Sequence, residues 1–137
     1  MRVLVIVLLF ALGLLPAHAL PESDRAAIRT VIEGQLEAFS ADDAARAYSF
    51  AAPAIRQLFP SEERFMTMVR EGYKPVYRRR AYTFGDLKED PDGIAQSVYL
   101  QDLDGADWVA VYTMEKQPDG TWQISGCFLL RRPGQSA

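Results

Sequence analysis

Histidine and cysteine are almost missing from this sequence of 137 residues, which contains one of each. The histidine is His18, near the start of the chain, so no imidazole follows it. Ser-His-Asp and Cys-His nucleophilic sites need an imidazole base, and catalytic zinc sites usually need at least one histidine ligand. We therefore expect none of these chemistries. The single Cys127 cannot form a disulfide within the chain, so it is either a small buried side chain or a thiol that pairs with another chain.

A hydrophobic run long enough to span a bilayer is missing as well. The uncharged apolar run Val3–Leu15 has 13 residues, whereas a spanning helix needs about 20. Arg2 precedes this run and Ala17-His18-Ala19 follows it, which is the pattern of a secretory signal peptide. We predict that residues 1–19 are a signal peptide, that the mature chain begins at Leu20, and that the protein is periplasmic or secreted in a bacterium. The alternative is an uncleaved N-terminal anchor.

An excess of positive charge is also absent. Without Arg2, 14 Lys and Arg residues (15 − 1) face 18 Asp and Glu residues, a formal net charge of −4 for residues 20–137. Nucleic-acid affinity comes mainly from neutralising phosphates, so nucleic acid is not an expected partner. A chain of this length suits one domain. We predict a single domain over residues 20–132 and a loose tail over residues 133–137.

The first part of the mature chain has the apolar period of a helix. Hydrophobic positions recur near every 3.6 residues and form one stripe, and Ser23 or Asp24 is placed to cap the helix. The stripe consists of Ile28, Ile32, Leu36 and Phe39. A first amphipathic helix is therefore expected here.

Two more helix starts follow. Asp43 has the reciprocal position of a capping box before a short helix over Ala44–Ala52. A further helical turn is expected over Ile55–Phe59. Ser61 then caps a third helix, and Gly72 is placed to end it as a left-handed cap. The pattern predicts three N-terminal helices.

The second half changes to the pattern of strands. Four segments are rich in β-branched and aromatic residues. They are Val76–Leu87, Ile94–Asp102, Trp108–Lys116 and Thr121–Arg131. An Asp-Gly pair stands at each junction and supplies the positive φ of tight hairpins. We predict an α+β fold in which the three helices pack on a curved four-stranded antiparallel sheet.

Several local motifs strengthen this layout. They are Glu37-Ala38-Phe39, Ala47-Tyr48-Ser49-Phe50-Ala51, Phe65-x-x-Met68-Val69 and Gly120-x-Trp122-x-Ile124-x-Gly126-Cys127. Together with the order of elements, they resemble the nuclear transport factor 2-like (SnoaL-like) superfamily, and within it a bacterial exported family of unknown function. The resemblance implies a cone with a pocket at its open end. Members of the superfamily include isomerases, dehydratases, ligand-binding modules and scaffolds that dimerise through the sheet, so the fold does not set the function.

The resemblance carries no catalytic residue over to this chain. No position matches the acidic base and the tyrosine or protonated-acid donors of the ketosteroid isomerase-like enzymes. The dehydratases rely on histidines, which the chain lacks after residue 18. A copied mechanism is therefore not expected.

One basic cluster, Lys74–Arg80, lies at the start of the first predicted strand. Side chains alternate along a strand, so at least one arginine, either Arg79 or the pair that flanks it, should point toward the helices. A guanidinium there needs a carboxylate, an open rim or an anionic ligand. The alternatives are an arginine that is exposed at the rim or paired with Asp102 or Glu115, and an arginine that binds an anion.

The acidic segment Asp102–Asp107 raises the question of calcium. A helix–loop–helix calcium site needs 12 residues and a distal glutamate, whereas this segment has six residues between two strands. We interpret it as a hairpin loop, and no metal or cofactor is predicted.

Aromatic residues and one arginine make up the predicted ligand-binding set. A pocket with tyrosine hydroxyls suits a small, partly apolar ligand, although the same side chains also suit a plain core. The candidates are Tyr48, Phe65, Met68, Tyr77, Arg79, Tyr99, Trp108 and Tyr112.

Three functions remain open from the sequence. The first is a non-catalytic module that binds a small apolar or anionic ligand. The second is a structural or assembly protein that dimerises through its sheet, and the third is an enzyme of the isomerase or dehydratase type that uses Asp, Glu, Tyr or Arg. The expected partners are thus a small molecule or a second copy of the chain, with no membrane contact after signal cleavage. A hollow cone without a carboxylate would favour the first function.

Overall fold

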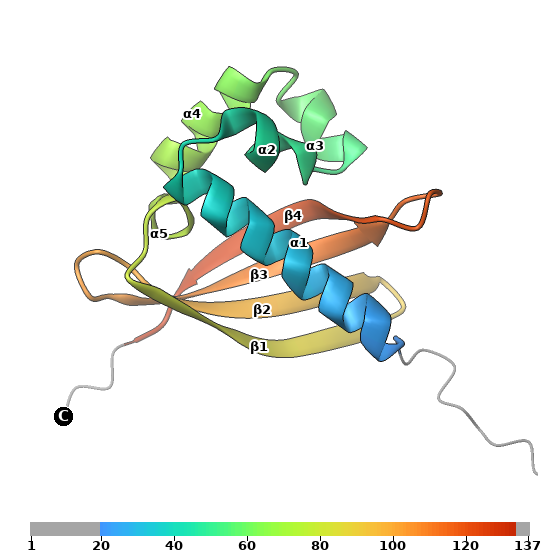
Figure 1. Cartoon of the computed structure of the whole chain (residues 1–137). Helices are drawn as coiled ribbons and strands as arrows, with labels where there is room; N and C mark the ends of the chain where they lie inside the picture. Colours follow the sequence, from blue (N-terminus) through green and yellow to red (C-terminus); the bar gives the residue numbers. More distant parts are fainter. Residues whose placement is uncertain (1–19, 134–137) are drawn as a thin grey trace, which may run out of the picture.

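The computed structural model describes residues 20–133 as an α+β arrangement of helices followed by a four-stranded antiparallel sheet (Figure 1). The predicted signal peptide and residues 134–137 lie outside the described residues. The helices are α1 (Glu22–Ser40), α2 (Ala44–Ser49), α3 (Pro53–Leu58), α4 (Glu62–Gly72) and α5 (Lys74–Tyr77), and the strands are β1 (Ala81–Asp90), β2 (Gly93–Gln101), β3 (Asp107–Lys116) and β4 (Trp122–Arg131). Within this part of the chain, none of the helices is both long and apolar enough to cross a membrane.

Helix α1 lies across one face of the sheet and supplies much of the core (Figure 1). The predicted stripe is confirmed, because all four of its residues are at most 1% exposed. The predicted cap is wrong. Pro21 is the N-cap and makes no side-chain hydrogen bond, while the Asp24 carboxylate accepts hydrogen bonds from Trp122 and Lys116 on the sheet. The Asp24 carboxylate therefore bonds to residues that are distant in the sequence, and the residues around Asp24 do not indicate these partners.

The short helices differ in part from their predicted ends. Ser61 caps α4 as predicted, because its Oγ accepts a hydrogen bond from the backbone N–H of Arg64. Asp43 is itself the N-cap of α2, with the same pattern toward Arg46. Gly72 is still helical and has no positive φ, so the predicted left-handed cap is wrong. The side-chain cap was therefore predicted correctly only for α4, whereas the caps of α1 and α2 and the end of α4 differ from the prediction.

The predicted second helix is too long, because the chain leaves it to join the sheet. Helix α2 ends at Ser49, and Ala51 then forms a parallel bridge with Ile124 of β4. The Ile124 N–H donates to Phe50 O at 2.8 Å, and the Ala52 N–H donates to Ile124 O at 2.8 Å. These bonds satisfy part of the edge of β4 and attach the helical layer to it.

The start of the first strand is also corrected. Residues 74–77 form helix α5, with Pro75 in its first turn, where a missing N–H costs nothing. Strand β1 begins only at Ala81, so Arg78 and Arg79 lie in a connection rather than a strand. The alternation argument therefore does not apply to these arginines.

The meander itself is confirmed. The strands pair in the order β1-β2-β3-β4, and each is antiparallel to the next. The three Asp-Gly turns have their glycines at positive φ, with values of 139° at Gly93, 85° at Gly105 and 88° at Gly120. Register shifts in the β1–β2 and β3–β4 ladders mark irregularities of the kind that bend a sheet. The buried face of this sheet forms the floor of the core.

Candidate functional site

A cavity of ≈ 290 Å³ lies between the short helices and the side of the sheet that is formed by β3 and β4. Helices α3 and α4 form one wall, β3 and β4 form the opposite wall, and α1 and α5 contribute the rest. The lining residues are Gln35, Phe39, Ile55, Leu58, Phe59, Phe65, Met68, Val69, Tyr73, Val76, Tyr112, Ile124, Ser125, Gly126, Cys127 and Phe128. This volume is close to the lower end of the range for small-molecule sites, about 300–1,000 Å³.

Two tyrosines, Tyr73 in the lining and Tyr48 next to it, connect the elements around the cavity. The Tyr48 hydroxyl on α2 donates to Phe59 O at 2.7 Å, which attaches the end of α3 to α2. The Tyr73 hydroxyl, between α4 and α5, donates to Cys127 O on β4 at 3.1 Å. The ring of Phe65 packs edge-on against Tyr48 with a centroid distance of 5.5 Å. These hydrogen bonds and this aromatic contact thus fix the positions of the elements that surround the cavity.

The lining is uncharged. In the part of the chain that the structure describes, no Asp, Glu, Lys or Arg borders this cavity. Gln35 is 4% exposed, and its Nε2 donates to Ala47 O at 3.2 Å. An ion placed here would lack a partner of opposite charge, which is costly in a buried site.

Tyr112 of β3 contributes the one buried side-chain hydroxyl without a hydrogen-bond partner among the described residues. The side chain is 1% exposed and borders the cavity. The neighbouring Cys127 sulfur affects its pKa, but the two groups do not meet with hydrogen-bond geometry. Burial raises the pKa of the Tyr112 phenol well above its usual value, so the hydroxyl keeps its proton. A protonated donor without an acceptor therefore lies buried in the wall of the cavity.

The thiol of Cys127, like the hydroxyl of Tyr112, belongs to the lining of the cavity. Cys127 lies opposite Tyr112 in the β3–β4 ladder. Burial raises the pKa of its thiol to about 12. The group is therefore a neutral thiol at physiological pH, and a poor nucleophile, since the thiolate is the reactive form. The side chain is partly buried and packs against the hydrophobic core, which is closer to the small apolar side chain expected from the sequence than to an exposed thiol.

The structure brings together only some of the predicted ligand-binding residues. Phe65, Met68 and Tyr112 line the cavity, and Tyr48 supports it through Phe65. The other four candidates, Tyr77, Arg79, Tyr99 and Trp108, are not among its lining residues.

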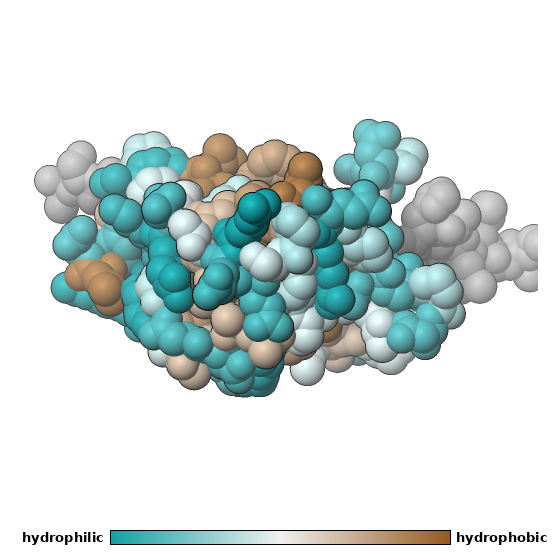
Figure 2. Space-filling view, turned by 90° about the horizontal axis from the view of Figure 1, so that it is seen from above, coloured by the Kyte–Doolittle hydropathy of each residue, from teal (hydrophilic) through white to brown (hydrophobic). Residues whose placement is uncertain are grey.

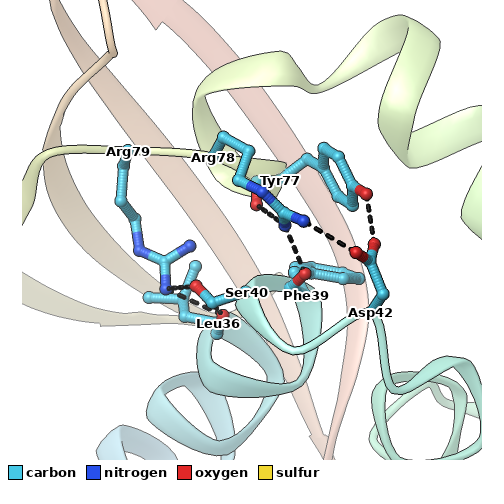
Figure 3. Close-up of polar contacts among 7 residues, drawn as sticks. All are labelled: Leu36, Phe39, Ser40, Asp42, Tyr77, Arg78 and Arg79. Carbon is cyan, nitrogen blue, oxygen red and sulfur yellow. Dashed lines mark hydrogen bonds and ion pairs between the residues drawn. The ribbon is translucent and has the colours of Figure 1, made fainter.

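Arg79 and Tyr77 belong to a polar cluster at the C-terminal end of α1 (Figure 3). The Arg79 guanidinium donates to Leu36 O at 2.7 Å and to Ser40 Oγ at 2.9 Å. Burial lowers the pKa of Arg79. Tyr77 donates to the Asp42 carboxylate. Helix α1 has no basic residue in its last turn, so this arginine supplies the cation that the negative end of the helix favours.

Arg78 completes this cluster (Figure 3). It donates to Phe39 O and, at 2.8 Å, to the Asp42 carboxylate, and its guanidinium carbon lies 4.1 Å from the ring centroid of Tyr77. Hydrogen bonds from Tyr77 and Arg78 lower the pKa of the Asp42 carboxyl. The cluster joins the segment before β1 to the end of α1.

Trp108 and Tyr99 are used elsewhere on the sheet. The Trp108 indole donates to the Asp102 carboxylate at 2.9 Å, and this bond, with backbone bonds from Ala106 and Asp104, lowers the pKa of Asp102. Asp102 thus closes the hairpin loop, as the hairpin interpretation predicts. Tyr99 points to the opposite face from buried Val98 and is 37% exposed.

Sequence reasoning missed several lining residues. Gln35 interrupts the apolar side of α1, and a buried polar residue at such a position is a usable signal. Tyr73 and Leu58 carried no signal, because their positions depend on how α3 and α4 meet β4. Within the described residues, no group of three or more His, Cys, Asp and Glu converges as a metal site.

Comparison with known proteins adds the family and nothing finer. No curated protein and no solved structure matches the chain significantly. A family model described as Domain of unknown function (DUF4864) matches residues 21–137. That match covers nearly all of the chain after the predicted signal peptide, and the protein belongs to this family.

Proposed function

We propose that this protein is an exported, non-catalytic module that binds a small, uncharged and mainly apolar ligand with one hydrogen-bond acceptor. The observation that carries the proposal is the hydroxyl of Tyr112, a buried donor without an acceptor beside an apolar cavity. Buried polar groups in folded proteins nearly always have a partner, and a ligand carbonyl or hydroxyl would supply one.

The character of the lining supports an uncharged ligand over an anionic one. The described residues around the cavity supply no cation, and the guanidinium of Arg79 is engaged at the end of α1. A carboxylate bound here would remain unpaired. A ketone, ester, amide or alcohol meets the Tyr112 hydroxyl without that cost.

The protonation states support binding over catalysis. General base catalysis needs a group that accepts a proton near the working pH. Tyr112 and Cys127 both have raised pKa values, so both hold their protons at neutral pH. They can donate a hydrogen bond and orient a ligand, which is the role of a binding site.

The arrangement of elements supports a nuclear transport factor 2-like cone. Helix α1 crosses the curved antiparallel sheet, the short helices stand over one end, and the cavity lies between these layers (Figure 1). The signal-peptide pattern of residues 1–19 supports export.

The test uses three probes of nearly equal size: acetophenone, ethylbenzene and benzoate. The cavity holds on the order of ten non-hydrogen atoms, if each takes about the 30 Å³ of one water. We expect acetophenone to raise the melting temperature with concentration, ethylbenzene to do so less, and benzoate not at all. In the Tyr112→Phe variant, the advantage of acetophenone over ethylbenzene should disappear.

A matched control separates the site from general effects. Tyr48→Phe removes a hydroxyl that is bonded to Phe59 O and not to a ligand, so the acetophenone advantage should remain. If benzoate binds best, or if neither neutral probe shifts the melting temperature at millimolar concentration, the proposal is wrong.

A second candidate function, assembly through the sheet, is favoured by exposed apolar residues on and near β4. Phe128 is 63% exposed and Leu130 is 56% exposed. Seen from above, hydrophobic residues gather along one margin of a mostly hydrophilic face (brown at the upper edge of Figure 2). Sedimentation of the wild type and of Leu130→Lys tests this candidate, because a dimer that uses this surface should dissociate in the variant.

A further inference from the structure

We propose that Glu89 is the binding site for the N-terminus of the mature chain, which begins at Leu20 after cleavage of the Ala19–Leu20 bond. The inference concerns processing and is independent of the ligand cavity. It joins a cleavage pattern in the sequence to a hydrogen-bonded cluster that the first described residue forms with a strand 69 positions away.

The cluster has three members. The backbone N of Leu20 donates to Glu89 Oε1 at 2.9 Å. Nη2 of Arg25, on α1, donates to the same oxygen at 3.0 Å, and Nε of Arg25 donates to Leu20 O at 3.4 Å. The Glu89 side chain is 14% exposed. The start of the domain is thus held by a mostly buried carboxylate near the end of β1.

Cleavage strengthens this contact. A protease adds one water across the C–N bond, which leaves a carboxylate on Ala19 and an amine on Leu20 that takes up a proton. The single amide donor then becomes an ammonium with three donors and a positive charge at the same place. A charge-assisted hydrogen bond is roughly twice as strong as a neutral one. Among residues 20–133, the bonds to Glu89 both reach Oε1, so Oε2 can receive a further N–H.

Only a chain that begins at Leu20 places its terminal amine next to the Glu89 carboxylate. The Leu20 side chain packs against the core, and α1 begins two residues later with Pro21 as its N-cap. One additional residue moves the terminal nitrogen by up to about 3.5 Å, beyond hydrogen-bond reach of the carboxylate. The geometry therefore distinguishes a chain that begins at Leu20 from one that begins at Ala19.

The first experiment expresses the full chain with its leader and measures the intact mass of the exported product. We expect the mass of residues 20–137. A product with any other N-terminus overturns the proposal.

The second experiment measures the pKa of the terminal amine from the pH dependence of its reductive methylation. An α-amino group normally has a pKa of about 7.7–8.0. Glu89 and Arg25 are the charged groups in direct contact with Leu20. The carboxylate should raise the pKa although the guanidinium opposes it, and we expect about a threefold to tenfold higher proton affinity than in Glu89→Gln.

Two comparisons keep the result interpretable. Glu22→Gln alters a first-turn glutamate that pairs with Arg29, so it should leave the amine unchanged. A chain that begins at Ala19, with Glu89 intact, should show the ordinary pKa even if Glu89→Gln folds poorly. Equal pKa values in the Leu20 and Ala19 chains would overturn the proposal.

Discussion

Removal of the Tyr112 hydroxyl should stabilise the ligand-free protein. Most substitutions of buried tyrosine by phenylalanine destabilise a protein, because they remove a hydrogen bond. Here the hydroxyl has no partner and the residue is 1% exposed, so the folded state carries the desolvation cost of an unpaired group. That cost is about 1–3 kcal/mol. The small space that the missing oxygen leaves offsets part of the gain, and we expect Tyr112→Phe to add about 1 kcal/mol.

The assay is urea unfolding of the wild type and three phenylalanine variants at equal m-value. The hydroxyls of Tyr48 and Tyr73 have real acceptors, Phe59 O at 2.7 Å and Cys127 O at 3.1 Å. Their removal should therefore cost about 1 kcal/mol each. Tyr112→Phe should change the free energy of unfolding in the opposite direction. If it loses as much stability as the two controls, the hydroxyl has a partner in the folded protein, and the reasoning behind the ligand is refuted.

Three further predictions concern other parts of the fold. Gly34→Ala should destabilise the protein by about 1–3 kcal/mol in thermal unfolding, because the new Cβ would lie 2.7 Å from the Phe50 ring. Gly72→Ala is the control: its Cβ would meet open space, so this variant should gain up to about 1 kcal/mol of stability. Hydrogen bonds from the Trp108 indole and from backbone N–H groups lower the pKa of Asp102. The contribution of this carboxylate to stability should therefore be complete above about pH 4 and be lost as the pH falls through the lowered pKa. Asp102→Asn should flatten this acid dependence of the free energy of unfolding in urea. With a pKa of about 12, the thiol of Cys127 should react with iodoacetamide at pH 8 on the order of 10³ times more slowly in native than in urea-unfolded protein, and equal rates would contradict the raised pKa.

Local chemistry allowed much of the fold to be predicted. The apolar stripe of α1 follows from helical periodicity, because only one face of that helix meets the sheet. Ser61 started α4 because its hydroxyl satisfies a free backbone N–H. The Asp-Gly pairs placed the three turns because glycine adopts positive φ without strain. Each of these signals lies within a few residues of the structure it produces.

The misplaced elements depended on distant partners. Helix α2 ends early because Phe50 and Ala52 form hydrogen bonds with Ile124 of β4, which lies more than 70 residues away in the sequence. Arg79 was expected to lie on a strand, and it reaches the end of α1 instead. Neither outcome can be predicted from the neighbouring residues, because both depend on contacts with segments that are distant in the sequence.

By itself, the sequence determined the α+β class, the antiparallel meander, the buried stripe of α1 and the absence of an imidazole after residue 18. These follow from side-chain periodicity, turn geometry and composition, which are local properties. Only the tertiary structure decided that a cavity remains between α3–α4 and β3–β4, and that its lining includes Tyr112, whose buried hydroxyl has no partner. The physical reason is that a cavity is the volume left between elements, and this volume depends on contacts such as Tyr73 to Cys127 that join residues 54 positions apart.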